Sequence, residues 1–311
     1  MKLSIIIVSY NTKDILDECL ESIYHSTIED PFEVIVVDNC SYDGSVKMIE
    51  TKYPKVNIIK NSVNNLFAKA NNQGAEIAKG EYLLLLNSDT IIYGDNIQKM
   101  INYFDTLDSK IICIGPKVLN PDRSLQSQGY PNPSIMERFT MCFKLYKILP
   151  SFILPMGVPI KRSIPRRVGW VVGACMMIRK EQYIKIGGLN EKVEFYGEEP
   201  EFGYRTTKLG YQTWYYPFAE IIHLGGKSTP TTALTKEQIA EKEKTRLRRY
   251  SLLQRETVGY KQAIYMSYVV LFAANIKKIL SNNKEYFTKS IIWEKKVIKY
   301  LKEKLHEEVT H

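Results

Sequence analysis

The most constraining feature of this chain is an apolar run, residues 82–86, that leads directly into the polar turn Asn87-Ser88-Asp89. An apolar run of this length, closed by turn-forming residues, is typical of a central strand covered on both faces. A carboxylate at the carboxyl end of such a strand lies where open α/β sheets bind ligands. There Asp89 could hold a hard divalent cation against a diphosphate. Taken alone, the triplet favours an ordinary strand-ending turn.

The first hundred residues alternate between strand and helix patterns. Strands are predicted at residues 3–8, 34–37, 56–59 and 82–86, and helices at 14–24, 45–52 and near 71–78. This order is typical of βαβ units around a parallel sheet, which predicts an α/β fold. The first glycine of the chain is Gly44. A glycine-rich phosphate loop cannot therefore follow the first strand, which argues against a dinucleotide dehydrogenase or a P-loop enzyme.

Beyond residue 100 the pattern is less regular. Six prolines and a basic cluster between residues 129 and 167 predict an irregular excursion over the substrate face. Further strands are predicted at residues 169–178, 211–216 and 219–222. Past Gly226 the chain is expected to be helical. A possible capping box at residues 235–238 opens a helix towards residue 257. Residues 260–280 are largely apolar but fall short of the ~20 apolar residues that cross a bilayer. Residues 285–305 place apolar side chains along one stripe between lysines.

The charge is unevenly placed along the chain. Of the 43 Lys and Arg and the 34 Asp and Glu, residues 1–226 hold 25 of each, so the whole net charge of +9 lies in residues 227–311. We therefore divide the chain into a neutral body, 1–226, and a basic helical extension, 227–311. A basic tail indicates an anionic partner, either an acidic membrane or nucleic acid. A helical annex that packs on the body or on another subunit explains the pattern about equally well.

The five cysteines are scattered and show no spacing typical of a disulfide framework or a zinc site, so a reducing cytosol fits best. The amino-terminal segment has one Lys and a short apolar run, and it is predicted to be a first strand, not a signal peptide.

Two groups of polar residues accompany the early strands. Asp38 directly follows the second strand, where its carboxylate could accept the imide N–H of uracil or thymine. Capping of the following turn is an equally good explanation. The amide-rich segment from Asn64 to Gly74 could bind ribose or base edges, although an ordinary helix start explains it better when it is taken alone.

Two more candidates lie near the end of the body. Glu198 and Glu199 are adjacent carboxylates, which can raise one another's pKa and so suit general-base chemistry. An acidic helix start is the simpler explanation. His223 follows an apolar strand and precedes paired glycines, which makes it a candidate metal ligand. A lone histidine is more often structural. The candidate residues therefore carry more weight as a set than any one of them does alone.

In this order the motifs resemble those of bacterial glycosyltransferases of family 2, of the inverting, nucleotide-sugar-dependent kind. The resemblance covers roughly the first 226 residues and runs through SIIIVSYN, EVIVVDN, NNQG, EYLLLLNSDT, WVVGACMMIRK, IGGLNE, FYGEE and IIHLGG. Within the family the chain looks most like rhamnosyltransferase-like members that build surface polysaccharides. The resemblance implies a GT-A fold, a single α/β domain around a mainly parallel sheet.

The resemblance also implies roles for individual residues. Asp89 would bind Mg²⁺ or Mn²⁺ bridging the diphosphate, and His223 would complete the metal site or touch the phosphates. Glu199 would be the catalytic base, with Glu198 orienting the acceptor or the base. Asp38 would contact the nucleotide base. Other contacts to the nucleotide and the donor sugar fall to Ser9, Tyr10, Asn11, Asn64, Asn71, Asn87, Ser88, Trp170, Gly173 and Ala174.

The chain departs from the family pattern at three points. Asn87 replaces the first Asp of the D-x-D-like motif, which leaves one charge fewer on the cation. Glu198-Glu199 replaces the usual Glu-Asp pair, so the choice of base stays open between them. Leu66 and Ala70 stand where glycines are usual, so the loop must differ if those positions need a positive φ.

The resulting expectation is metal-dependent transfer of rhamnose or a similar hexose from a UDP- or dTDP-sugar to a hydroxyl of a glycan or lipid-linked acceptor. A lipid-linked acceptor would place the protein in the cytoplasm, peripherally at the inner face of the cell membrane. The alternatives are a nucleotide-sugar-binding scaffold with weak turnover and a sugar-phosphate nucleotidylyltransferase. The latter would need a glycine-rich loop after the first strand. Nucleic acid is the least favoured partner, and the oligomeric state stays open.

Overall fold

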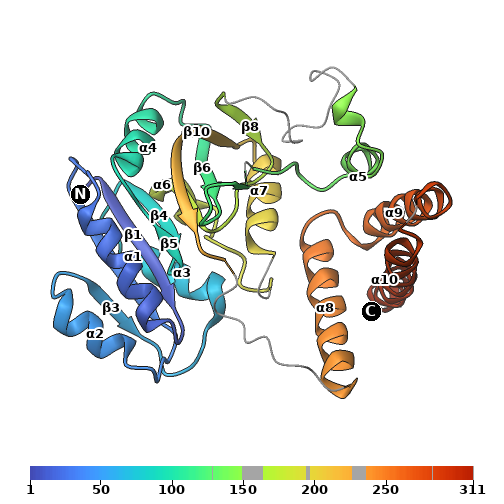
Figure 1. The fold of residues 1–311 in the computed structure, drawn as a ribbon, viewed down its shortest axis with the longest axis horizontal. Helices are drawn as coiled ribbons and strands as arrows, with labels where there is room; N and C mark the ends of the chain where they lie inside the picture. Colours follow the sequence, from blue (N-terminus) through green and yellow to red (C-terminus); the bar gives the residue numbers. More distant parts are fainter. Residues whose placement is uncertain (128, 149–163, 194–196, 226–235, 282, 311) are drawn as a thin grey trace.

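The computed structural model describes residues 1–127, 129–148, 164–193, 197–225, 236–281 and 283–310. Its centre is a mixed sheet of ten strands in which β3-β2-β1-β4-β9-β6-β10-β5 pair in that order, while β7 pairs with β6 and β8 with β10 (Figure 1). The strands are β1 Leu3–Ser9, β2 Phe32–Asp38, β3 Asn57–Lys60, β4 Tyr82–Asn87, β5 Thr90–Ile91, β6 Ile111–Leu119, β7 Leu125–Ser127, β8 Arg166–Val168, β9 Cys175–Arg179 and β10 Gln212–His223.

The α/β fold is confirmed, and the four strands predicted in the first hundred residues are all present. β1, β2, β3 and β4 pair in parallel. The helices between them are α1 Lys13–His25, α2 Ser45–Lys52 and α3 Leu66–Ile77. The third helix begins five residues before its predicted start near residue 71. The sheet is parallel in this half and mixed beyond it, because β9 runs antiparallel between β4 and β6.

Helices cover both faces of the sheet, which explains the continuous apolar run in β4. Leu84 and Leu86 point to the face covered by α1, α2 and α4 Asn96–Asp105. Leu83 and Leu85 point to the face covered by α3 and α6 Lys180–Lys185. Since successive side chains of a strand alternate between faces, a strand buried on both sides has no polar face to show in its sequence.

Three predictions for the second half need correction. The strand expected at residues 169–178 is shorter, because β9 begins at Cys175. The two strands expected at 211–216 and 219–222 are one strand, β10, whose ladder to β6 shifts between Tyr216 and Glu220. Pro217 lies at this shift and has no N–H to donate to a ladder. The sequence did not single out β5, β6, β7, α4 or α6.

The segment expected to be irregular contains a helix. α5 Ile135–Cys142 begins at Ser134, whose hydroxyl accepts a hydrogen bond from the Glu137 N–H at 3.0 Å. A short 3₁₀ turn, Leu145–Lys147, follows, and the chain rejoins the sheet at β8. Residues 149–163 of the predicted excursion lie outside the described residues.

The extension past residue 226 is helical, as predicted. Its helices are α8 Lys236–Glu256, α9 Tyr260–Leu280 and α10 Lys284–Thr310, and Thr235 of the predicted capping box lies outside the described residues. The apolar stripe predicted at residues 285–305 packs against α9 and α8 in a small separate core. By length and composition alone, α9 is apolar enough to cross a membrane, contrary to the expectation that it was too short.

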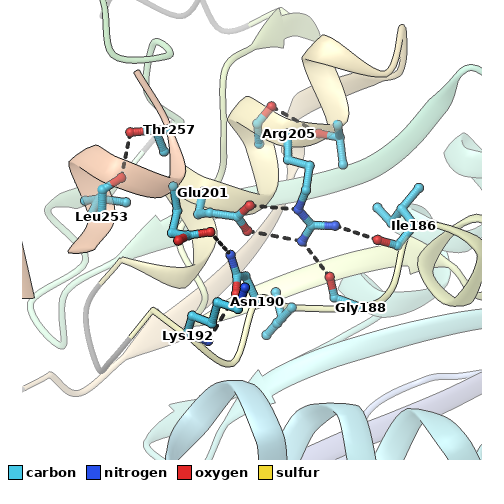
Figure 2. A network of polar contacts seen from close by, with 12 residues as sticks. Ile186, Gly188, Asn190, Lys192, Glu201, Arg205, Leu253 and Thr257 are labelled. Atoms are coloured by element: carbon cyan, nitrogen blue, oxygen red, sulfur yellow. Dashed lines mark hydrogen bonds and ion pairs between the residues drawn. The ribbon is translucent and has the colours of Figure 1, made fainter. Parts of the chain in front are cut away.

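Arg205 fastens helix α7, Glu198–Lys208, to the segment that precedes it and also forms an ion pair with Glu201 within the helix (Figure 2). The Arg205 guanidinium donates to both carboxylate oxygens of Glu201, at 2.7 and 3.1 Å. It also donates to the Ile186 and Gly188 carbonyls, each at 2.7 Å. Only 1 % of Glu201 is exposed, so its charge depends on this partner. These contacts fix the first turn of α7, which carries Glu198 and Glu199.

Replacing Arg205 by methionine is expected to lower the free energy of unfolding by about 3–5 kcal/mol, because the Glu201 carboxylate would stay buried without its partner. Chemical denaturation measures the loss. The double variant Glu201→Gln/Arg205→Met removes the stranded charge and should recover part of it. A loss below about 1 kcal/mol in the single variant would show that Arg205 does not hold α7 in place.

Candidate functional site

The carboxyl ends of three parallel strands meet at one edge of the sheet. Ser9, the last residue of β1, is in register with Asp38, the last residue of β2. Val8 is in register with Asn87, the last residue of β4. The predicted site residues that follow β1, β2 and β4 therefore start from one edge, as expected for ligand sites in α/β sheets.

His223 joins this edge from the far end of the sequence. The antiparallel pairing of β10 with β5 sets His223 opposite Thr90. Its Nε2 lies 3.1 Å from Asp89 Oδ1 and 3.3 Å from Asn87 Nδ2. A backbone hydrogen bond joins the same two segments, because the Leu224 N–H donates to the Asp89 carbonyl at 2.8 Å. The two predicted metal ligands are thus direct neighbours.

Gln126 in β7 holds the other side of the His223 ring, and the sequence did not single it out. Its Oε1 lies 2.7 Å from His223 Nδ1. Its amide nitrogen donates to the His223 carbonyl at 3.1 Å and to Asn120 Oδ1 at 2.9 Å, which assigns the orientation of the amide. Nδ1 must then carry a proton, so in the neutral ring Nε2 keeps the lone pair that a cation beside Asp89 would need.

The ligand set decides how a cation could be held. Among the described residues, His, Cys, Asp and Glu side chains do not gather in a group of three or more that could hold a metal ion. Asp89 and His223 provide one carboxylate and one imidazole. This set fits Mg²⁺ or Mn²⁺ when diphosphate oxygens and water complete the coordination, as is usual for Mg²⁺.

Glu199 is tied to the same edge through two consecutive residues, Gly173 and Ala174. The Gly173 N–H donates to Glu199 Oε1 at 2.9 Å. The next carbonyl, that of Ala174, accepts the Asn87 N–H at 3.1 Å. A Cβ at position 173 would lie 2.5 Å from Glu199 Oε1, so the carboxylate can approach this backbone only because the residue is glycine.

The environment of Glu199 changes its acidity. Burial raises the pKa of the Glu199 carboxyl above its ordinary value, and the hydrogen bond from Gly173 opposes the rise only in part. A carboxyl with a raised pKa is a stronger base once ionised, which suits proton abstraction near neutral pH.

Glu198 faces a different way from Glu199. It is 3 % exposed, and its Oε2 accepts the N–H of Gly197 at 2.8 Å. A carboxylate that receives a backbone N–H at the first turn of a helix stabilises that turn. The sequence left the choice of base open, and this geometry favours Glu199.

Asp38 carries an unused acceptor. Its Oδ2 accepts the Ser41 N–H at 2.9 Å, whereas its buried Oδ1 has no hydrogen-bond partner among the described residues. A buried carboxylate oxygen without a donor is costly. A ligand N–H supplied from the edge of the sheet would satisfy it, as the predicted contact to a base requires.

The turn after β1 is linked to the turn after β4. The Ser9 hydroxyl lies 3.1 Å from Thr12 Oγ1, which donates to Ser88 Oγ at 3.4 Å. Asn11 has a φ of 52° and accepts the Tyr42 N–H at 2.9 Å, while Tyr10 is exposed. The predicted residues of this turn are thus brought together with Ser88.

The amide loop fits the prediction less well. Asn64 Oδ1 accepts the N–H of Leu66 at 2.9 Å. Leu66 adopts a φ of 62°, so the left-handed conformation survives where the family has glycine. Asn71 is buried within α3 and donates to the Phe67 carbonyl at 2.9 Å. This contact is internal to the helix and does not link Asn71 to the other predicted residues.

Trp170 fastens the segment that leads to α5. Its ring stacks on Tyr130 with centroids 4.3 Å apart, and its Nε1 donates to the Pro131 carbonyl at 3.0 Å. Because Gly173 and Ala174 follow three and four residues later, this contact joins the α5 segment to the site.

Comparisons with known proteins identify the family of the chain. The family model described as glycosyl transferase family 2 matches residues 4–187. An N-acetylglucosaminyl-diphospho-decaprenol L-rhamnosyltransferase from Mycobacterium tuberculosis is 27% identical over 240 residues, 73% of this chain and 77% of the relative. A poly(ribitol-phosphate) beta-glucosyltransferase from Bacillus spizizenii is 32% identical over 142 residues, 44% of this chain and 22% of the relative.

Two solved structures share the fold. GalNAc-T7 with UDP, GalNAc and Mn²⁺ superposes with a TM-score of 0.62 at 15% identity, over 100% of this chain and 57% of that one. The mannosyltransferase PcManGT from Pyrobaculum calidifontis with GDP-Man and Mn²⁺ superposes with a TM-score of 0.57 at 13% identity, over 98% of this chain and 87% of that one. The chain has the GT-A fold. The sequence, the sheet and the polar edge lead to one conclusion: this protein belongs to glycosyltransferase family 2.

Proposed function

We propose that the protein is an inverting, metal-dependent glycosyltransferase that moves a hexose from a UDP- or dTDP-sugar to a hydroxyl of a glycan or lipid-linked acceptor. One observation carries the proposal: Gly173 and Ala174 bind Glu199 and the Asn87 turn side by side. A candidate base and a candidate cation site therefore share one edge of the sheet.

Different residues of the site act on the donor and on the acceptor in the proposed reaction. Asp89 and His223 would hold a divalent cation, which would offset the charge of the diphosphate leaving group. Glu199 takes the proton of the acceptor hydroxyl as it attacks the anomeric carbon opposite the leaving group. The carbon–oxygen bond to the acceptor forms as the bond to the diphosphate breaks, so the anomeric centre inverts.

The choice of donor rests on two supports. The unused Asp38 Oδ1 suits the imide N–H of uracil or thymine, whereas guanine offers an N–H pair and adenine has no imide. Rhamnose is supported by the Mycobacterium tuberculosis relative, a rhamnosyltransferase by name. The same relative acts on a decaprenol-linked saccharide by name, which supports a lipid-linked acceptor. With such an acceptor, we propose a role in cell-surface polysaccharide synthesis at the inner face of the membrane.

A non-catalytic nucleotide-sugar-binding scaffold is the second candidate, and turnover separates the two. Such a scaffold would have no use for a carboxylate of raised pKa beside the donor edge. Nucleotidylyl transfer is not supported by the family match.

Replacing Glu199 by glutamine is expected to lower kcat for sugar transfer by roughly 10²–10⁴-fold, because the amide cannot accept the hydroxyl proton. Donor binding should persist. The variant should unfold at no lower temperature than the parent at neutral pH, because a raised pKa means that ionised Glu199 destabilises the fold. Glu198→Gln is the matched control, and a larger loss there would exchange the two roles.

The same raised pKa predicts the acidic limb of the pH profile. The base works only when ionised, so kcat should fall as the pH drops through the pKa of Glu199, above the ordinary carboxyl range near 4.3. A profile of kcat between pH 4 and 9 measures it. A limb at the ordinary carboxyl value would argue against Glu199 as the base.

Gly173→Ala tests the contact that places the base. The added Cβ would displace the Glu199 carboxylate, and a misplacement of this size is expected to reduce kcat by up to roughly 10²-fold. Stability should change little, because the displaced group ends a flexible side chain. In a Glu199→Gln background the same substitution should have no further effect on kcat. An equal loss in both backgrounds would show that Gly173 acts elsewhere.

Gln126 provides a test of the cation site by binding alone. Gln126→Leu removes the acceptor for His223 Nδ1–H and is expected to weaken Mn²⁺ affinity by about 10–100-fold. Gln126→Glu keeps an acceptor and should retain the affinity. Thermal shifts with UDP- or dTDP-sugars across a Mn²⁺ titration measure both, because a bound donor stabilises the fold by mass action. Equal affinities for the leucine variant and the parent would remove His223 from the site.

A further inference from the structure

Helix α9 exposes an apolar stripe that its packing leaves uncovered. Tyr265, Tyr268, Phe272 and Ile279 recur at intervals of three, four and seven residues, so they lie along one side of the helix, and all four are exposed. Phe272 alone is 59 % exposed. An exposed row of large apolar side chains is typical of a surface that contacts another protein or a membrane.

Helix α5 continues this surface. Ile135, Met136 and Phe139 are exposed on it. The ring of Phe139 lies 4.8 Å from that of Phe143, which in turn lies 6.3 Å from that of Phe272. Figure 1 shows α5 beside α9, away from the central sheet, and the two helices pack together. We call the exposed apolar residues of these two helices the α5–α9 face.

The opposite side of α9 is already occupied. Ala263 and Ile264 are buried against Val297, Ile298 and Leu301 of α10, in the core of the extension. Helix α10 carries many charged, exposed side chains and cannot follow α9 into hydrocarbon. α9 can therefore present its free stripe to a membrane from the side but cannot cross it. The apolar stripe of α10 is used up in this packing and is not the contact surface.

The charged side chains of α5 and α9 are basic with one exception. α9 contains no Asp or Glu, and the only acidic residue of α5 is Glu137, which is buried. Lys144 and Lys147 are exposed at the end of α5, and Lys277 and Lys278 close α9. From α10, Lys302 Nζ lies 5.6 Å from the ring of Tyr268. Aromatic side chains ringed by lysines match the headgroup region of an anionic bilayer.

We infer that the α5–α9 face docks the protein on the surface of an anionic phospholipid bilayer, with α9 lying in the interface. Phe139, Phe272 and their neighbours enter the headgroup layer, and the lysines bind acidic headgroups. The stacked pair Tyr130–Trp170 joins the α5 segment to the site, so docking at α5 would set the site beside the membrane. The value of this for a lipid-linked acceptor rests on the proposed function, whereas the docking itself does not.

Vesicle co-sedimentation of the full chain tests the inference without donor or acceptor, so its outcome is independent of sugar transfer. Vesicles of phosphatidylglycerol and phosphatidylcholine should bind the protein, and vesicles of phosphatidylcholine alone should bind it at least about fivefold more weakly. Phe272→Glu and Phe139→Glu should each lower the partition coefficient at least about tenfold. Unchanged thermal unfolding would show that both variants fold.

Phe218→Glu is the matched control, because Phe218 is 55 % exposed on β10 of the body, and it should leave vesicle binding unchanged. Equal losses in Phe218→Glu and Phe272→Glu, or no loss in the α5–α9 variants, would overturn the inference. So would a change from dimer to monomer in Phe272→Glu with unchanged vesicle binding, since the face would then be a contact between two copies of this chain.

Discussion

The site depends on the two-residue backbone link at Gly173 and Ala174. One carbonyl receives the Asn87 N–H from the end of β4, and the preceding N–H is donated to Glu199 at the start of α7. A parallel strand in place of β9 would bring its carboxyl end, not its amino end, to this edge. The antiparallel insertion of β9 between β4 and β6 is therefore what lets residues about a hundred positions apart share one edge.

The edge also concentrates unfavourable electrostatics. Glu199 is held where burial disfavours its charge, and Asp38 keeps a buried oxygen without a donor among the described residues. The two-sided core of the sheet and the hydrogen bonds that Arg205 donates to Glu201, Ile186 and Gly188 offset these costs elsewhere. Polar groups that lack hydrogen-bond partners until the ligand binds also give specificity. A wrong ligand would leave these groups unpaired, which weakens its binding.

Apolar stripes in the helical extension have two different surroundings. Both α9 and α10 carry apolar stripes, yet that of α10 packs against neighbouring helices, whereas one side of α9 is exposed beside α5. The excess positive charge of the chain lies in this same part. Attraction to an anionic surface falls off within about a Debye length, so lysines beside the exposed rings contribute more than lysines elsewhere on the extension.

The sequence by itself determined the first half of the sheet and the motifs of the edge. Strands buried on both faces and helices with a regular apolar period are local patterns, so β1 to β4 and α1 to α3 could be predicted from neighbouring residues. The ends of parallel strands must meet, so the convergence of Asp38 and Asp89 followed from the same pattern. The placement of Asn71 did not follow, because a buried amide in a helix and an exposed one at its start look alike in sequence.

Only the tertiary structure decided the rest, because it depended on contacts between distant segments. The direction of β9, the support of His223 by Gln126 and the joining of β10 across Pro217 are set by pairing partners that no local window contains. The preference for Glu199 over Glu198 came from the partner of each carboxylate, since Glu199 accepts the N–H of Gly173 in the site and Glu198 accepts the N–H of its neighbour Gly197. The exposed stripe of α9 could not be predicted either, because its packing against α10 determines which of its apolar sides is buried and which stays exposed.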